Sequence, residues 1–253
     1  MPHIDLHNDR PGIVGLFQYR PDTAGPLMEL TELLLRGQST LSRGERELIA
    51  MYVSALNECQ YCTLTHATKA TAQLPDGMLG ALESDKLRGL LRIAAAVQRS
   101  GRAVTKELVD NARQVGATER EIHDTVLIAA AFCMYNRYVD GLDAVAPDDA
   151  ETYLRMADFV MERGYTAALE PPEEDEDASQ VAKVREEVFR LVTSNGANSA
   201  LCELPGDDVQ DVRDDAQDLQ LLQQVQHATP VAVAAKPYRI PPRDRRMHVA
   251  RQT

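Results

Sequence analysis

The spacing of apolar residues predicts a chain of helices through the first two thirds of the sequence. Apolar positions recur at helical intervals, and no segment shows the period-two alternation of a half-buried strand. Residues before 27 are expected to be irregular, because Pro11-Gly12 and Arg20-Pro21 interrupt the pattern. The fold class is therefore predicted to be all-α, with helices over residues 27–35, 42–56, 57–73, 84–99, 105–115, 118–138 and 150–168.

Two of these helices carry a capping-box pattern at their start. Ser42 is followed by Glu45, and Thr118 is followed by Glu121. In this arrangement the hydroxyl and the carboxylate each bind a free backbone N–H of the first turn. The pattern fixes the beginning of both helices.

The composition changes at Glu170. Pro171-Pro172 and an acidic run over 173–177 are typical of a solvated linker. We expect a helical domain over residues 1–169, and an acidic linker with a weakly ordered C-terminal extension over residues 170–253. The function is expected to lie in the first part.

Charge and composition exclude several classes of partner. The net charge is −12, and only residues 219–253 carry an excess of basic groups, so a nucleic-acid partner is not expected. The longest apolar run, 126–135, is too short to cross a bilayer, so no membrane partner is expected. The N-terminus has no targeting pattern, which predicts a cytoplasmic location. Four cysteines in 253 residues do not make a disulfide scaffold.

Cys59, Cys62 and His66 form the candidate reactive group. They lie at positions i, i+3 and i+7, which places them on one face of a helix. Amides at a helix N-terminus favour a thiolate, and His66 lies one turn beyond Cys62, within reach as its base. Cys59 is the candidate resolving thiol. Glu47, on the preceding helix, can face the histidine and orient it if the two helices form a hairpin.

A structural zinc site is the alternative for this group. Cys59, Cys62 and His66 would supply three ligands, and the fourth would come from Glu47, His123 or Cys133. No second pair of closely spaced cysteines or histidines accompanies the first. We therefore predict redox chemistry, with no metal and no organic cofactor.

The motif resembles that of the alkylhydroperoxidase D-like members of the carboxymuconolactone decarboxylase family. The resemblance rests on Glu47, eleven intervening residues, Cys59-Gln60-Tyr61-Cys62, three intervening residues and His66. The stretches 11–13, 41–47, 121–123 and 136–142 are also similar to the peroxidase-related branch, so the resemblance covers about residues 10–165. The best-known members have a histidine before the second cysteine, where this sequence has Tyr61.

The resemblance implies a helical bundle with two related halves, a hydroperoxide as substrate and an assembly of three or six copies. It implies that Cys62 attacks the peroxide, that Cys59 resolves the product to a disulfide, and that Glu47 and His66 relay protons. The reductant would be a lipoyl-type dithiol or another thiol. The alternatives are a general dithiol–disulfide oxidoreductase, a lactone decarboxylase, and an interaction protein that binds through residues 170–253.

The sequence also contains a possible internal repeat. Glu121 is followed by Cys133, Asn136 and Asp140 at the same offsets that separate Glu47 from the two cysteines and His66. We interpret this as a second copy that lost the redox residues. The alternative is a coincidence between two similar helix pairs.

Overall fold

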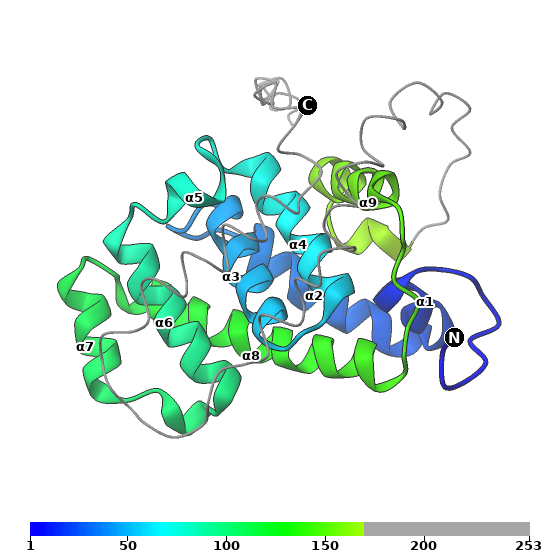
Figure 1. Cartoon of the computed structure of the whole chain (residues 1–253), viewed down its shortest axis with the longest axis horizontal. Coiled ribbons are helices and arrows are strands. Elements are labelled where there is room, and N and C mark those ends of the chain that lie inside the picture. Colours follow the sequence, from blue (N-terminus) through cyan, green and yellow to red (C-terminus); the bar gives the residue numbers. More distant parts are fainter. Residues whose placement is uncertain (170–253) are drawn as a thin grey trace, which may run out of the picture.

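The computed structural model describes residues 1–169, so the predicted extension over 170–253 lies outside the described part. The described chain is helical and contains no strand, as the sequence predicts (Figure 1). Its helices are α1 Gly12–Tyr19, α2 Pro21–Arg36, α3 Arg43–Leu56, α4 Gln60–Gln73, α5 Gly77–Ala81, α6 Asp85–Arg99, α7 Lys106–Gln114, α8 Glu119–Gly141 and α9 Ala150–Arg163, with 3-10 turns η1 Gly101–Ala103 and η2 Thr166–Leu169.

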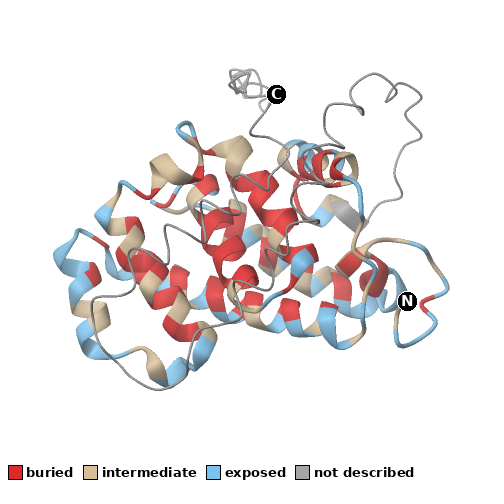
Figure 2. Ribbon diagram, in the orientation of Figure 1, coloured by how far each residue is buried: buried red, intermediate tan, exposed pale blue. Residues whose placement is uncertain are grey.

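Helix α3 lies at the centre of the bundle. It packs against α4, α6 and α8, while α6 and α7 form one end of the molecule and α1 and α9 the other (Figure 1). Every residue from 46 to 55 is buried, so α3 is enclosed on all sides (Figure 2). Any polar side chain on α3 must therefore find its partners inside the protein.

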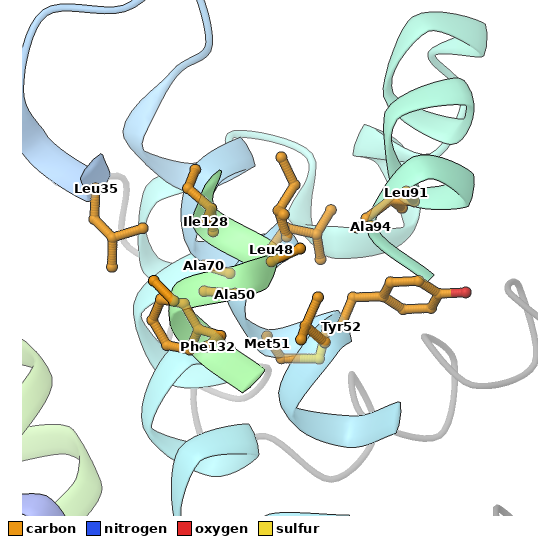
Figure 3. Close-up of a cluster of buried hydrophobic side chains, with 14 of the residues drawn as sticks. Leu35, Leu48, Ala50, Met51, Tyr52, Ala70, Leu91, Ala94, Ile128 and Phe132 are labelled. Atoms are coloured by element: carbon orange, nitrogen blue, oxygen red, sulfur yellow. The ribbon is translucent and has the colours of Figure 1, made fainter. Parts of the chain in front are cut away.

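The main core forms around α3. Figure 3 shows side chains from α2, α3, α4, α6 and α8 meeting there, among them Leu48, Met51, Ala70, Leu91 and Phe132. A second, smaller apolar cluster lies between α1, α4, α8 and α9, and it contains both Cys59 and Cys62. No helix in residues 1–169 combines the length and the apolarity needed to cross a bilayer.

Both predicted capping boxes are present. The Ser42 N–H donates to Glu45 Oε2 at 2.7 Å, and the Glu45 N–H donates to Ser42 Oγ at 3.1 Å. Thr118 and Glu121 repeat this exchange at 2.8 and 3.2 Å. The first turns of α3 and α8 are thereby fixed by local sequence.

The expectation of an irregular lead-in is confirmed for residues 1–11 and is wrong from residue 12 onward. Residues 12–19 form α1, and α2 begins at Pro21. Pro21 occupies the first helical position, where its missing N–H costs no hydrogen bond. Gly12 opens α1 at φ 52°, a conformation that favours glycine. The last predicted helix also ends early, at Arg163, where Gly164 takes φ 89°.

The break between α3 and α4 lies slightly later than predicted. Asn57 and Glu58 form a turn, with Glu58 at φ 61°. The Cys59 N–H then donates to the Ser54 carbonyl at 3.0 Å, and Cys59 becomes the N-cap of α4. Cys59 therefore precedes the helix that we expected it to belong to.

The proposed residue-by-residue repeat is not reproduced. Glu47 lies on α3 and the two cysteines and His66 follow the turn, whereas Glu121 to Asp140 lie on the single helix α8. Glu121 occupies the third position of its helix, as Glu45 does, so it corresponds to the capping glutamate rather than to Glu47. The α3–α4 hairpin and α8 are similar at their capped starts. They differ further along, because the turn at Glu58 separates α3 from α4 whereas α8 continues as one helix.

Candidate functional site

The hairpin of α3 and α4 brings Glu47 to His66. His66 Nδ1 lies 2.7 Å from Glu47 Oε2, and the two residues are only 7% and 2% exposed. The contact follows from the fully buried face of α3, because a carboxylate there has no access to water. The expected juxtaposition of these two residues is therefore present in the structure.

The two cysteines lie at the start of α4. Both are free thiols; Cys59 is the N-cap and Cys62 the third helical residue. The Cys62 sulfur thus sits in the first turn, where the helix dipole favours negative charge. Both side chains are buried.

The Cys59 thiol is held in its protonated form. A hydrogen bond to Cys62 is the largest cause that raises the pKa of Cys59, followed by burial and by the charge of Cys62. The Asp140 carboxylate also hydrogen-bonds this thiol, although burial raises its own pKa. Cys59 is therefore poorly suited to act as the attacking thiolate of the pair.

Two buried residues that the sequence analysis did not single out complete the site. The Tyr165 hydroxyl donates to Glu47 Oε1 at 2.7 Å, and the Lys69 ammonium lies 4.7 Å from the centroid of the Tyr165 ring. Lys69 is only 2% exposed. Its spacing of seven residues from Cys62, on the same helix face, was a signal available in the sequence. Tyr165 lies a hundred residues away along the chain and gave no such signal.

The charges of this cluster follow from its burial and its contacts. Burial alone would raise the pKa of Glu47, but the His66 hydrogen bond, the nearby Lys69 charge and the Tyr165 hydroxyl outweigh it and lower the pKa. Burial, reinforced by Lys69, lowers the pKa of His66. Burial also lowers the pKa of Lys69, although the charges of Glu47 and Cys62 act in the opposite direction. Glu47 is therefore ionised and His66 neutral at neutral pH.

The ionised carboxylate decides the tautomer of His66. Because it can only accept hydrogen bonds, the proton must be on Nδ1, and Nε2 carries the free lone pair. Phe132 contacts the imidazole edge-on at 4.6 Å between ring centroids, and Tyr165 stacks on it at 6.4 Å. The ring is thereby oriented as a proton acceptor, one helical turn from Cys62.

Tyr61 forms a wall of the second cluster. Its ring packs on the backbone of Gly12, where an added Cβ would lie 2.2 Å from the ring, and it meets Tyr153 at 6.2 Å. Burial, together with the nearby cysteines and Tyr153, raises the pKa of Tyr61, so its hydroxyl stays protonated. A phenol in this position cannot serve as the base that a histidine would be.

The other residues considered as metal ligands lie elsewhere. His123 is exposed and pairs with Asp124 at 3.2 Å, while Cys133 accepts a hydrogen bond from Asn57 at 3.6 Å. Within residues 1–169, no three His, Cys, Asp or Glu side chains are grouped so that they could hold a metal ion. Of the three fourth ligands considered for a zinc site, Glu47 contacts His66, whereas His123 and Cys133 have other partners.

Comparison with known proteins finds a family similarity over the residues of this site. The sequence of residues 21–74 matches the model of the carboxymuconolactone decarboxylase family, and this range contains Glu47, Cys59, Cys62 and His66. This part of the chain is similar to the carboxymuconolactone decarboxylase family. The resemblance noted in the sequence is thereby confirmed. No curated protein matched the sequence.

The fold of the chain is shared with a solved structure. An uncharacterized peroxidase-related protein from Silicibacter sp. TM1040 superposes with a TM-score of 0.51 at 24% sequence identity. The match covers 57% of this chain and 78% of that protein. It supports the all-α architecture in which α3 and α4 position the site.

Proposed function

We propose that the chain is an enzyme that reduces a hydroperoxide with Cys62 as nucleophile, Cys59 as resolving thiol, and Glu47 and His66 as proton relay. The observation that carries the proposal is the 2.7 Å contact between His66 and Glu47, one helical turn from Cys62. A nucleophile, a base and a carboxylate that orients the base form a general scheme for activating a thiol. The family match and the peroxidase-related neighbour support the reaction class.

The first step consumes the peroxide. His66 Nε2 takes the proton of Cys62, and the thiolate attacks one oxygen of the O–O bond. An S–O bond forms as the O–O bond breaks, which leaves a sulfenic acid on Cys62. The departing alkoxide takes the proton back from His66 and leaves as an alcohol.

The second step closes the disulfide. The Cys59 sulfur attacks the sulfenic sulfur, the hydroxide leaves, and the Cys59 proton converts it to water. The hydrogen bond to reduced Cys62 and burial raise the pKa of Cys59, so Cys59 enters the cycle protonated and must lose its proton as its sulfur attacks. An external dithiol, such as a lipoyl-type compound, then reduces the disulfide and is itself oxidised. Assembly into trimers or hexamers stays a prediction from the family resemblance.

The test measures consumption of a small organic hydroperoxide in the presence of a dithiol. We expect Cys62→Ser and Cys59→Ser each to abolish turnover, while the matched control Cys133→Ser retains it. A sulfenic acid should be trapped by a dimedone reagent only in the Cys59 variant. Native turnover no faster than the uncatalysed background, with the Cys59–Cys62 disulfide still forming and exchanging, would replace this proposal with a dithiol–disulfide oxidoreductase.

A further inference from the structure

The Tyr165 hydroxyl binds the oxygen of the Glu47 carboxylate that His66 does not contact. Its hydroxyl donates to Glu47 Oε1 at 2.7 Å, while His66 holds Oε2 at the same distance. Tyr165 is 5% exposed and Glu47 is 2% exposed, so water does not compete for either oxygen. Each carboxylate oxygen thus has a separate hydrogen-bond partner, from separate parts of the chain.

The segment that carries Tyr165 is held in place by α2. Gly164 ends α9 with φ 89°, which turns the chain back toward the bundle. The Tyr165 N–H then donates to Glu32 Oε2 at 2.8 Å. Arg36 binds Glu32 at 3.1 Å and also donates to the Met161 carbonyl at 3.2 Å. These contacts tie both sides of the turn to one helix.

The ring of Tyr165 is packed between charged and aromatic neighbours of α4. It lies nearly parallel to the His66 imidazole, with an interplanar angle of 19°, and its face receives the Lys69 ammonium at 4.7 Å. A face-on cation is an attractive contact for an aromatic ring. The ring therefore contributes to packing independently of the hydroxyl, and a phenylalanine would keep both contacts.

We propose that Tyr165 is a positioning residue for the Glu47–His66 pair, and that its hydroxyl selects the tautomer of His66. The proposal rests on the proposed role of His66 as a base. A buried carboxylate with one unsatisfied oxygen tends to take up a proton. Once protonated, Glu47 would donate to Nδ1, and the imidazole proton would move to Nε2. That tautomer has no lone pair on Nε2 and cannot accept the proton of Cys62.

The charged groups around Glu47 decide in which direction its pKa moves when the Tyr165 hydroxyl is removed. Lys69 and His66 face it from α4, Tyr165 reaches it from the turn after α9, and Glu32 and Arg36 on α2 form an ion pair beside that turn. Removal of the Tyr165 hydroxyl leaves Lys69 and His66 as the remaining groups that favour ionised Glu47. Protonation of Glu47 is then expected at a higher pH than in the native protein.

The experiment observes the imidazole nitrogens of the full chain by two-dimensional ¹H–¹⁵N NMR, with the His66 signals assigned from a His66→Gln variant. In the native protein we expect the proton on Nδ1 across the neutral range. In Tyr165→Phe we expect the Nε2-protonated form to appear as the pH falls toward neutrality. We also expect peroxide turnover at neutral pH to fall roughly 10-fold, the scale of a lost hydrogen bond to a charged group.

Tyr135→Phe is the matched control. Tyr135 is also buried, and its hydroxyl donates to the Leu27 carbonyl at 3.0 Å, away from Glu47. It should cost similar stability and leave the His66 tautomer unchanged. A second variant, Glu32→Ala, loosens the Tyr165 segment without altering the tyrosine and should shift the tautomer in the same direction.

An unchanged His66 tautomer in Tyr165→Phe over the full pH range would overturn the proposal. The NMR readout does not depend on turnover. A native protein without peroxidase activity would therefore refute the proposed function while leaving the role of Tyr165 measurable.

Discussion

Lys69→Met removes the one lysine charge of the site and keeps a side chain of similar length. Lys69 is 2% exposed, and its charge acts on both Glu47 and the Cys62 sulfur. When Cys62 gives its proton to His66, the site holds two anions and two cations, and Lys69 is one of the cations. Without it, the thiolate would form beside Glu47 with only the imidazolium as a counter-charge.

The magnitude follows from helix geometry. Seven residues span about 10 Å along a helix, and a lysine side chain leans back toward the N-terminus, so ideal helix geometry gives a separation of ~7 Å between the ammonium and the Cys62 sulfur. At an effective dielectric constant of ~20, this separation corresponds to ~2 kcal/mol of attraction between unit charges. We therefore expect the thiolate population of Cys62 in Lys69→Met to fall roughly 30-fold, since ~1.4 kcal/mol is a factor of ten.

Alkylation by iodoacetamide measures this population, because only the thiolate reacts. The modified position is located by fragmentation mass spectrometry, and Cys133 in the same sample serves as the internal reference. Local opening that admits the reagent is common to both proteins and cancels in the ratio of rates. Lys86→Met is the control: Lys86 binds Glu121 at 2.9 Å and should leave the alkylation of Cys62 unchanged. A Cys62 rate in Lys69→Met within a factor of two of native would refute the electrostatic argument.

Two further predictions concern stability. Gly12→Ala should destabilise the protein by ~2–4 kcal/mol in urea unfolding, because Gly12 has φ 52° and the new methyl would enter the Tyr61 ring. Gly141→Ala is the control: its methyl meets open space, so the free energy of unfolding should change by less than ~1 kcal/mol. Glu121 is buried, which would raise its pKa, but hydrogen bonds from the Thr118 backbone and other donors lower it from 4.5 to about 2. The ionised form therefore contributes ~3 kcal/mol above pH 4.5, and this is lost as the pH falls toward 2. Glu121→Gln should remove that part of the acid-unfolding curve, and an unchanged slope in this window would contradict the assignment.

The sequence predicted the parts of the fold that depend on local signals. Both capping boxes form as expected, because Ser42 and Thr118 each have a glutamate three residues later. Helix α1 was missed because Gly12 was taken as a break, whereas its positive φ lets the chain enter the helix. Local signals specify where a capped helix begins. They do not show which glycine is required by a positive φ or by a close tertiary contact and which one ends a helix.

The site was predictable only as far as one motif extends. Glu47 and His66 meet because α3 and α4 form a hairpin, which short sequence separation favours. Tyr165 reaches Glu47 because the chain turns at Gly164 and because Glu32 binds the Tyr165 N–H. Both hydrogen bonds of Tyr165 join segments that lie more than a hundred residues apart, which no local pattern reveals. The matched offsets of Glu121 suggested a second copy of the motif, but the absence of a turn in α8 gives those residues a different geometry.

The N-terminal residues have a consequence for how the thiols meet their reagents. Leu6 and Leu16 belong to the apolar cluster around Cys59 and Cys62. The His3 and Gly12 amides bind the Leu142 and Val145 carbonyls in the segment after α8. Cys59 and Cys62 are 0% and 4% exposed, so a reagent reaches sulfur only when this cluster opens. The observed reaction rate is then the product of an opening equilibrium and an intrinsic rate, as in hydrogen exchange. A bulkier reagent needs a larger opening of the cluster, so the observed reaction rates of the two thiols should fall as the reagent grows.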